Sequence, residues 1–573
     1  MVDRFIKYSL GVLMLISSGL LFAQNNNEEE YTHETIGERP ISPSYRITEK
    51  PSVIDTVIPT PKVEYPLLTR NMRTDISIQQ IDPSKIRIIE KLDKLYPAYV
   101  RLGIGNYASP LAELYLNSKR HRRMSYGLHA KHNSMFGKLK GWAPANYDRT
   151  RVGAFGEFNT GDFLFETEVN YLNHGYRFYG LEDTTDFYTK DADTLINRVQ
   201  GFHAGLALSN TPRKDSATLL WKAHTDYMYF HEFRRDWDTT GRNARNHNYS
   251  FGGDFAYKFK QHVFRVDADL NINRYWAGES DTLIDSLYRK DENNTIIHLR
   301  PYATTYFRRL KVMYGVDINF DFPAKDQSVL QILPAVEAKY SLLNDMAIPY
   351  IGAGGDLKQN SFYTLNRQNN FITSSVELRN TRTFDAYAGV RGALSKRMSY
   401  NMRFHFRRYT NLPLFINDMA FSDGYKYTVV YDLVDAIGGT TSLSYQIKEK
   451  LKVDAIYEYN FWNPDQQEYA WHLPEHKLTI RGNYNLFDKI YVKADFLLES
   501  GRKSPVYLFN PADDDIPVDL GLIADGNLHL EYRYNKKVSA FLQFNNIAAQ
   551  KYFRWHRYRV QGFQVLGGVT FAF

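Results

Sequence analysis

The feature that most constrains this chain is a regular alternation of apolar and polar residues, which recurs many times after residue 96. The stretch Phe264 to Asn273 reads FRVDADLNIN, with an apolar side chain at every second position from Phe264 to Ile272. Successive side chains of a β-strand point to opposite faces, so one face of this strand is apolar and the other is charged. A transmembrane β-barrel has such strands, with lipid outside and a polar interior. A soluble sheet rarely carries this much charge in register.

The connections between the alternating runs predict the topology, because short polar turns alternate with longer polar loops along the chain. Ten short turns imply about 11 hairpins, and therefore an all-β fold: a transmembrane antiparallel β-barrel of about 22 strands over residues 97–573, with both ends on one side. Longer loops lie between the turns, for example residues 278–293 and 363–382. The predicted short turns are residues 119–123, 159–162, 211–216, 258–261, 308–311, 342–345, 395–397, 448–450, 487–489 and 535–537.

The N-terminal part of the chain differs from the rest. Residues 1–23 have two basic residues, a short apolar run and a small residue at Ala23, which predicts a secretory signal peptide. Residues 24–96 begin with a polar and acidic stretch and carry six prolines from Pro40 to Pro66, which predicts a short irregular periplasmic segment and a partial occluder of the barrel. The chain has no cysteine, which excludes disulfides and thiolate metal sites.

Composition agrees with a membrane barrel and argues against a nucleic-acid partner. Aromatic residues make up 15% of the chain, including 43 Tyr and 36 Phe, which suits the aromatic girdles of a barrel. Mean hydropathy is −0.47, as expected when half of each strand faces a polar interior. The formal net charge of +7 is too small for a nucleic-acid-binding surface on a chain of this length.

The C-terminal stretch FNNIAAQKYFRWHRYRVQGFQVLGGVTFAF resembles the closing hairpin of TonB-dependent receptors, through Asn545-Asn546-Ile547, Lys551-Tyr552, an aromatic-rich last loop, Gly562 and the terminal Phe573. The resemblance implies an integral protein of a Gram-negative outer membrane, in contact with outer-membrane lipid. It also implies that the barrel-assembly machinery recognises the terminal strand. Val569, Phe571 and Phe573 share the apolar face of that strand and are the expected assembly signal.

The resemblance covers the barrel alone. The family has a folded plug domain and a TonB box before the first strand, whereas residues 24–96 have no plug-like pattern. The chain therefore looks most like the plug-less, receptor-like barrels of Bacteroidota. A barrel this wide would leak without a stopper. We expect loops such as residues 363–382, the segment 24–96 or another protein to occlude it.

The polar face of the predicted strands supplies the candidate site residues. Two interpretations stay open, a polar path for a solute and a hydrated network of ion pairs that braces the barrel. The lumen-facing polar residues predicted from the alternation are Glu166, Glu168, Arg265, Asp267, Asp269, Asp317, Asp321, Arg403, Arg407, Arg481, Asp525, Glu531 and Arg533.

The sequence predicts no catalytic residue, no metal site and no cofactor. His129 and His132 are three residues apart and therefore point to opposite faces of a strand. No Ser, His and Asp residues have a relative placement that the sequence fixes. Two functions remain: porin-like binding or passage of a solute across the outer membrane, and a non-transporting scaffold subunit of a secretion or assembly complex. In the second, the proline-rich segment docks a periplasmic or lipoprotein partner.

Overall fold

The computed structural model describes residues 94–137, 144–180, 195–211, 219–233, 244–277, 291–422, 424–448, 450–506 and 516–573. The predicted signal peptide and nearly all of the predicted periplasmic segment lie outside these residues.

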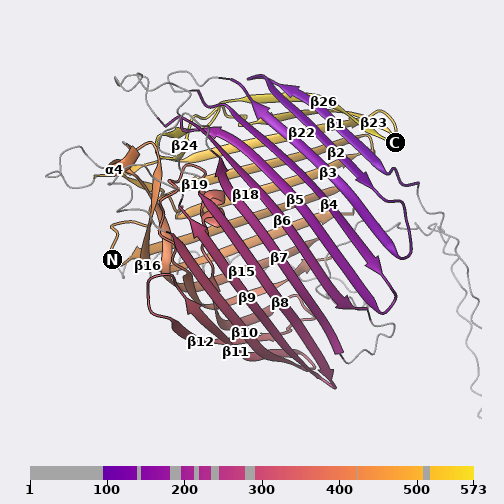
Figure 1. The fold of residues 1–573 in the computed structure, drawn as a ribbon. Helices are drawn as coiled ribbons and strands as arrows, with labels where there is room; N and C mark the ends of the chain where they lie inside the picture. Colours follow the sequence, from indigo (N-terminus) through magenta and orange to yellow (C-terminus); the bar gives the residue numbers. More distant parts are fainter. Residues whose placement is uncertain are drawn as a thin grey trace, which may run out of the picture. The chain divides into compact units, whose positions relative to one another are not determined.

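The described residues form a closed antiparallel sheet of 22 strands (Figure 1). Each strand pairs with its neighbours in chain order, and the first strand pairs with the last, for example Gly103 with Gly568. The predicted fold and strand number are confirmed. The 22 strands are β1 (Ala98–Gly105), β2 (Ser109–Asn117), β3 (Met124–Met135), β4 (Tyr147–Asn159), β5 (Phe163–Arg177), β6 (Ile196–Asn210), β7 (Leu219–Phe233), β8 (Arg245–Phe259), β9 (His262–Trp276), β10 (Glu292–Phe307), β11 (Leu310–Phe322), β12 (Val329–Tyr340), β13 (Ile348–Lys358), β14 (Thr381–Ser395), β15 (Met398–Asn417), β16 (Tyr427–Ile447), β17 (Leu451–Pro464), β18 (His476–Leu486), β19 (Ile490–Ser500), β22 (Ile523–Arg533), β23 (Val538–Asn545) and β26 (Gln564–Ala572).

The remaining elements lie in the connections. Two small hairpins pair β20 (Lys503–Val506) with β21 (Ile516–Asp519), and β24 (Phe553–Trp555) with β25 (Tyr558–Arg559). The helices within the described residues are α3 (Phe362–Gln368) and α4 (Met419–Ser422). In the described part of the chain, neither helix is long and apolar enough to cross a membrane.

The two rims of the barrel differ in their connections. The predicted short turns join strands at one rim wherever the structure describes them, as between Phe259 of β8 and His262 of β9. Both ends of the sheet lie at this rim, where Ala98 and Phe573 exchange backbone hydrogen bonds of 3.1 and 2.9 Å. The long loops lie at the other rim, which is the extracellular rim of an outer-membrane barrel.

The two faces of the wall differ as the alternation predicts. In the last strand, Val569 and Phe571 are 40% and 42% exposed, whereas Thr570 between them is 3% exposed. Phe264 and Val266 of β9 are likewise exposed. An apolar surface of this extent belongs against lipid rather than water. The apolar run at the C-terminus is therefore part of the outer wall.

Candidate functional site

The loop between β13 and β14, residues 359–380, crosses the extracellular mouth of the barrel; we call it the crossing loop. It contains α3, which begins at a capping box in which the Ser361 hydroxyl accepts a hydrogen bond from the backbone N–H of Thr364. Phe362 and Leu365 of α3 are 1% and 0% exposed. The loop therefore packs against other residues of the mouth instead of extending into solvent.

The crossing loop is buried in an apolar cluster, which we call the mouth cluster. It draws side chains from β5 to β9, from β15 and β16, and from the last loop of the barrel. Burial of this much apolar surface favours the closed position of the loop, at roughly 1.5–3 kcal/mol for each large side chain. The cluster comprises Tyr176, Phe178, Leu195, Val199, Phe230, Ala244, Tyr275, Ala277, Phe362, Leu365, Ile372, Val376, Leu378, Phe415, Tyr427, Val429 and Tyr558.

Three loops meet at the centre of this cluster. Phe371 of the crossing loop stacks on Tyr558 of the last loop, with ring centroids 3.5 Å apart. Tyr179, which follows β5, contacts both rings edge-on, at 5.0 Å from Tyr558 and 5.7 Å from Phe371. Connections from separate parts of the barrel wall thus contribute to a single aromatic contact at the mouth.

Hydrogen bonds attach the crossing loop to the surrounding wall. The backbone N–H of Tyr363 donates to Asn246 of β8 at 3.1 Å, and that of Leu378 donates to Glu292 of β10 at 2.5 Å. On the other side, the backbone of the loop pairs with Tyr427 of β16 through two hydrogen bonds of 2.7 and 2.8 Å. These bonds satisfy polar groups that burial would otherwise leave unpaired, at a cost of about 1–3 kcal/mol each.

The last loop, between β23 and β26, is held by buried polar groups. Arg502 is 1% exposed and donates to the carbonyl oxygens of Phe553 and Arg554 at 3.0 and 3.2 Å. Burial lowers the pKa of Arg502 to about 10, so it stays charged at neutral pH. Burial also lowers the pKa of His472 to about 3 and that of His556 to about 4, so both imidazoles are neutral at pH 7.

A cavity of about 700 Å³ lies beneath the crossing loop, between α3 and the inner face of β3 to β7. Tyr363, Asn366, Arg367 and Asn370 of the crossing loop form its roof. The wall is contributed by His129, Arg149, Arg151, Glu168, Asn170, Leu172, His174, Val199, Gly201, His203, Met228 and Phe230. The cavity is therefore bounded by the barrel and by the loop that closes it.

The charge of this cavity is positive. It is lined by the guanidinium groups of Arg149, Arg151 and Arg367, against one carboxylate, Glu168. Arg149 lies 3.4 Å from His174 through its Nη2 atom, and Arg367 donates to the Tyr363 hydroxyl at 3.4 Å. Within the described residues, none of these three arginines has a carboxylate oxygen within ion-pair distance.

The structure distributes the predicted lumen-facing residues around the wall, and of these only Glu168 lines the cavity. Their proposed role toward a solute stays a prediction. Most of them are engaged in ion pairs across the wall. Glu166 pairs with Lys222 at 2.9 Å, Arg481 with Asp495 at 3.8 Å and Arg533 with Glu531 at 3.4 Å. His298 lies between Asp269, at 3.5 Å, and Asp317, at 2.9 Å, and Asp385 lies between Arg403, at 2.5 Å, and Arg407, at 3.4 Å. Asp321 accepts from Asn380 of the crossing loop at 2.7 Å, Asp525 accepts from the Tyr552 hydroxyl at 2.7 Å, and in the sheet register Arg265 lies opposite Tyr302 and Asp267 opposite Arg300.

Sequence reasoning missed the arginines of the cavity. Arg149 and Arg151 are two residues apart on β4 and therefore share a face, which was a signal available in the sequence. Arg367 lies in a loop and has no periodicity to place it. His129 lines the cavity, whereas His132 is bonded to Thr150 at 2.8 Å on the opposite face. In the part of the chain that the structure describes, no group of three or more potential ligands is placed to hold a metal ion.

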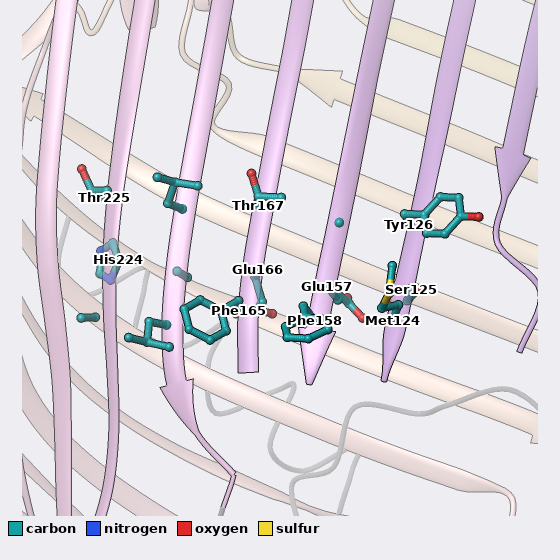
Figure 2. A pocket seen from close by; sticks show the side chains of 15 residues that line it. Met124, Ser125, Tyr126, Glu157, Phe158, Phe165, Glu166, Thr167, His224 and Thr225 are labelled. Carbon is teal, nitrogen blue, oxygen red and sulfur yellow. The ribbon is translucent and has the colours of Figure 1, made fainter. Parts of the chain in front are cut away.

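A second recess, of about 580 Å³, lies on the outer wall across β3 to β7 (Figure 2). Phe158 and Phe165 lie side by side there on neighbouring strands, directly opposite each other in the register. Tyr126 and Leu206 beside them are 58% and 59% exposed. This recess is apolar and belongs to the lipid-facing surface, so the candidate solute site is the inner cavity.

Comparisons with known proteins identify the fold. No protein-family model matches the chain, and no curated protein matches it. Among solved structures, the siderophore receptor PirA from Acinetobacter baumannii is similar with a TM-score of 0.64 at 12% identity, covering 84% of this chain and 81% of that chain. The ferripyoverdine receptor of the Pseudomonas aeruginosa outer membrane has a TM-score of 0.61 at 13% identity, covering 84% and 72%. The copper transporter OprC has a TM-score of 0.58 at 14% identity, covering 84% and 81%.

These likenesses, at such low identity, concern the fold and not the ligand. They agree with the closed 22-stranded sheet and with the apolar outer wall. The chain therefore has the barrel fold of outer-membrane receptors and is an integral outer-membrane protein.

Proposed function

We propose that this protein is a non-enzymatic, receptor-like barrel that binds a solute in its interior and passes it across the outer membrane, with the crossing loop as the gate. The observation that carries the proposal is the position of this loop, whose residues Phe371 and Ile372 meet the last loop and β16 in the middle of the mouth. A solute that enters from outside has to displace the loop before it reaches the inner cavity.

The energetics of the mouth support a gate that rests closed. The crossing loop buries Phe362, Leu365, Ile372, Val376 and Leu378, each at most 2% exposed. Opening exposes these side chains to water, and the loop's hydrogen bonds with the wall are exchanged for bonds with water. The backbone of the loop also pairs with Tyr427, the first residue of β16, so opening breaks these two hydrogen bonds.

We further propose that the barrel works without a plug domain and that residues 24–96, alone or with a periplasmic or lipoprotein partner, restrict the periplasmic end. The available support is the composition of this segment, which is rich in proline and lacks a plug-like pattern. Recognition of the terminal strand by the barrel-assembly machinery belongs to the same proposal.

Conductance across planar bilayers tests the gate. In one variant a Gly-Ser linker replaces residues 361–378; in the control, three glycines replace the exposed residues 326–328 at the same rim. We expect the wild type and the control to conduct little and the linker variant to conduct in large steps. Equal conductance of the wild type and the linker variant contradicts a gating role.

The periplasmic segment is tested in the same assay. We expect deletion of residues 24–83 to enlarge the conductance steps of the linker variant and to leave the wild type closed, because the segment only narrows a path that the crossing loop closes. If barrels that lack both segments stay closed, neither segment is the occluder and the proposal is wrong.

A further inference from the structure

We propose that the cavity beneath the crossing loop binds a small soluble polyanion, carrying two or more carboxylate or phosphate groups, and that this anion links the loop to the barrel wall. The inference rests on the proposed function, because it assigns the ligand class of the same cavity. Its basis is the set of three arginines that line the cavity and have no carboxylate partner among the residues that the structure describes.

The arginines come from two separate parts of the fold. Arg149 and Arg151 lie on one face of β4, and Arg367 lies in the last turn of α3 in the crossing loop. Like charges gathered around one cavity repel each other, more strongly near the protein than in free water. An anion between them removes this repulsion and accepts charge-assisted hydrogen bonds, which guanidinium groups form readily with carboxylates and phosphates.

Several other basic residues of the inner wall have carboxylate partners. Arg407 and Arg403 share Asp385, and Lys222 is paired with Glu166. Lys131 on β3, two residues from the cavity residue His129, is paired with Glu113 at 2.6 Å. Arg149, Arg151 and Arg367 differ from these residues, because Glu168 is the only carboxylate among the described residues that line their cavity, and its Oε1 accepts from Asn170.

The size of the cavity and its other groups limit the ligand. A volume of about 700 Å³ suits a small molecule and excludes a folded protein. Asn170 and Asn366 add amide donors, and Tyr363 adds a hydroxyl. Leu172, Met228 and Phe230 provide an apolar side. The cavity therefore fits a compact organic anion with an apolar part better than a hydrated inorganic cation.

Isothermal titration calorimetry on the full chain in detergent tests the inference. The probes are citrate and pyrophosphate, which separate carboxylate from phosphate recognition, with acetate and spermidine as low-charge and cationic comparisons at constant ionic strength. We expect saturable binding of at least one polyanion and none of acetate or spermidine. Absence of saturable binding by both polyanions overturns the proposal.

Substitutions locate the binding. Arg149→Gln combined with Arg151→Gln is expected to weaken the polyanion at least about tenfold, as loss of charge-assisted hydrogen bonds implies. Arg367→Gln alone is expected to weaken it less. Arg309→Gln is the control, because Arg309 is exposed in a short turn at the opposite rim, and its affinity should equal that of the wild type. Equal affinities of the double variant and the wild type overturn the assignment.

The two proposals fail in different ways. If the linker variant does not change conductance but the polyanion still binds through Arg149 and Arg151, the gate is wrong and the anion site stands. If the linker variant opens the barrel but no polyanion binds, the gate stands and the anion site is wrong.

Discussion

Gly568 lies where the last strand of the barrel pairs with the first. A Cβ atom at this position would overlap the carbonyl oxygen of Leu102 on β1, and the ring of Phe541 lies close by on the inner side. Phe541 is 3% exposed and is covered by the guanidinium of Arg101, 3.9 Å from the ring centroid. The glycine therefore permits a close approach of strands at the contact that closes the barrel.

We expect Gly568→Ala to destabilise the barrel by about 1–3 kcal/mol, because the two strands must separate to accept the methyl group. The measurement is the temperature at which the folded form is lost during electrophoresis in detergent. Gly482→Ala on β18 is the control, since the nearest atom to its added Cβ is 4.0 Å away. Equal loss temperatures for the two variants would contradict this explanation of Gly568.

The buried His472 makes the closed mouth sensitive to acid. The unfolded chain binds a proton at His472 near pH 6.5, whereas burial lowers the pKa of the folded side chain to about 3. The folded state therefore binds fewer protons in this window, and stability falls as the pH drops below about 6.5, until it levels off below about 3. At pH 5 the loss from His472 is about 2 kcal/mol.

We expect the last loop to become more accessible to protease between pH 7 and pH 5, and His472→Gln to remove part of this dependence. His121 lies in an exposed short turn at the opposite rim, and His121→Gln should keep the full dependence. A pH profile that is unchanged in His472→Gln would exclude this histidine as the cause.

At the scale of elements, the crossing loop is held in the mouth by side-chain packing and by two backbone hydrogen bonds to Tyr427 of β16. The side chain of Phe371 contacts Tyr179 and Tyr558, which both lie outside the 22 wall strands. A change at Phe371 should therefore act on the mouth and leave the barrel wall intact.

We expect Phe371→Ala to raise the frequency of channel openings about tenfold, because a partly buried ring is expected to lose less than the 3–5 kcal/mol typical of a fully buried one, and about 1.4 kcal/mol corresponds to a factor of ten. Heat resistance of the barrel should stay within the error of the wild type. Phe487→Ala, at a residue 85% exposed in a short turn, is the control for both measurements. If the Phe371→Ala barrel loses heat resistance but its channel does not open more often, Phe371 stabilises the barrel wall and does not hold the mouth closed.

The strands were predictable from sequence and the mouth was not, for a physical reason. A run such as Phe264 to Asn273 carries its own periodicity, and turn residues mark its ends, so local information suffices. Phe371 and Tyr558 stack across the mouth although 187 positions separate them along the chain. The roles of these rings depend on loops meeting in space. In the cavity, the alternation of apolar and polar residues could have placed Arg149 and Arg151 on the inner face of β4. It could not place Arg367, because Arg367 lies in a loop.

At the scale of the whole molecule, β26 closes the barrel by pairing with β1. The Phe573 side chain is 62% exposed, while its backbone is bonded to Ala98 in both directions. The side chain therefore adds little buried area to the folded barrel. We expect the Phe573 side chain to act during assembly of the barrel.

We expect Phe573→Gln to lower the amount of folded barrel in cells severalfold, while the purified, refolded variant keeps a stability within about 1 kcal/mol of the wild type. Immunoblots of outer-membrane fractions measure the first quantity and urea titration the second. Phe487→Gln is the control, because that ring is also exposed at the short-turn rim but lies outside the terminal strand. If both variants assemble like the wild type, the Phe573 ring is only part of the wall surface. If Phe573→Gln also lowers the free energy of unfolding by several kcal/mol, Phe573 acts in closure of the barrel and not in recognition by the assembly machinery.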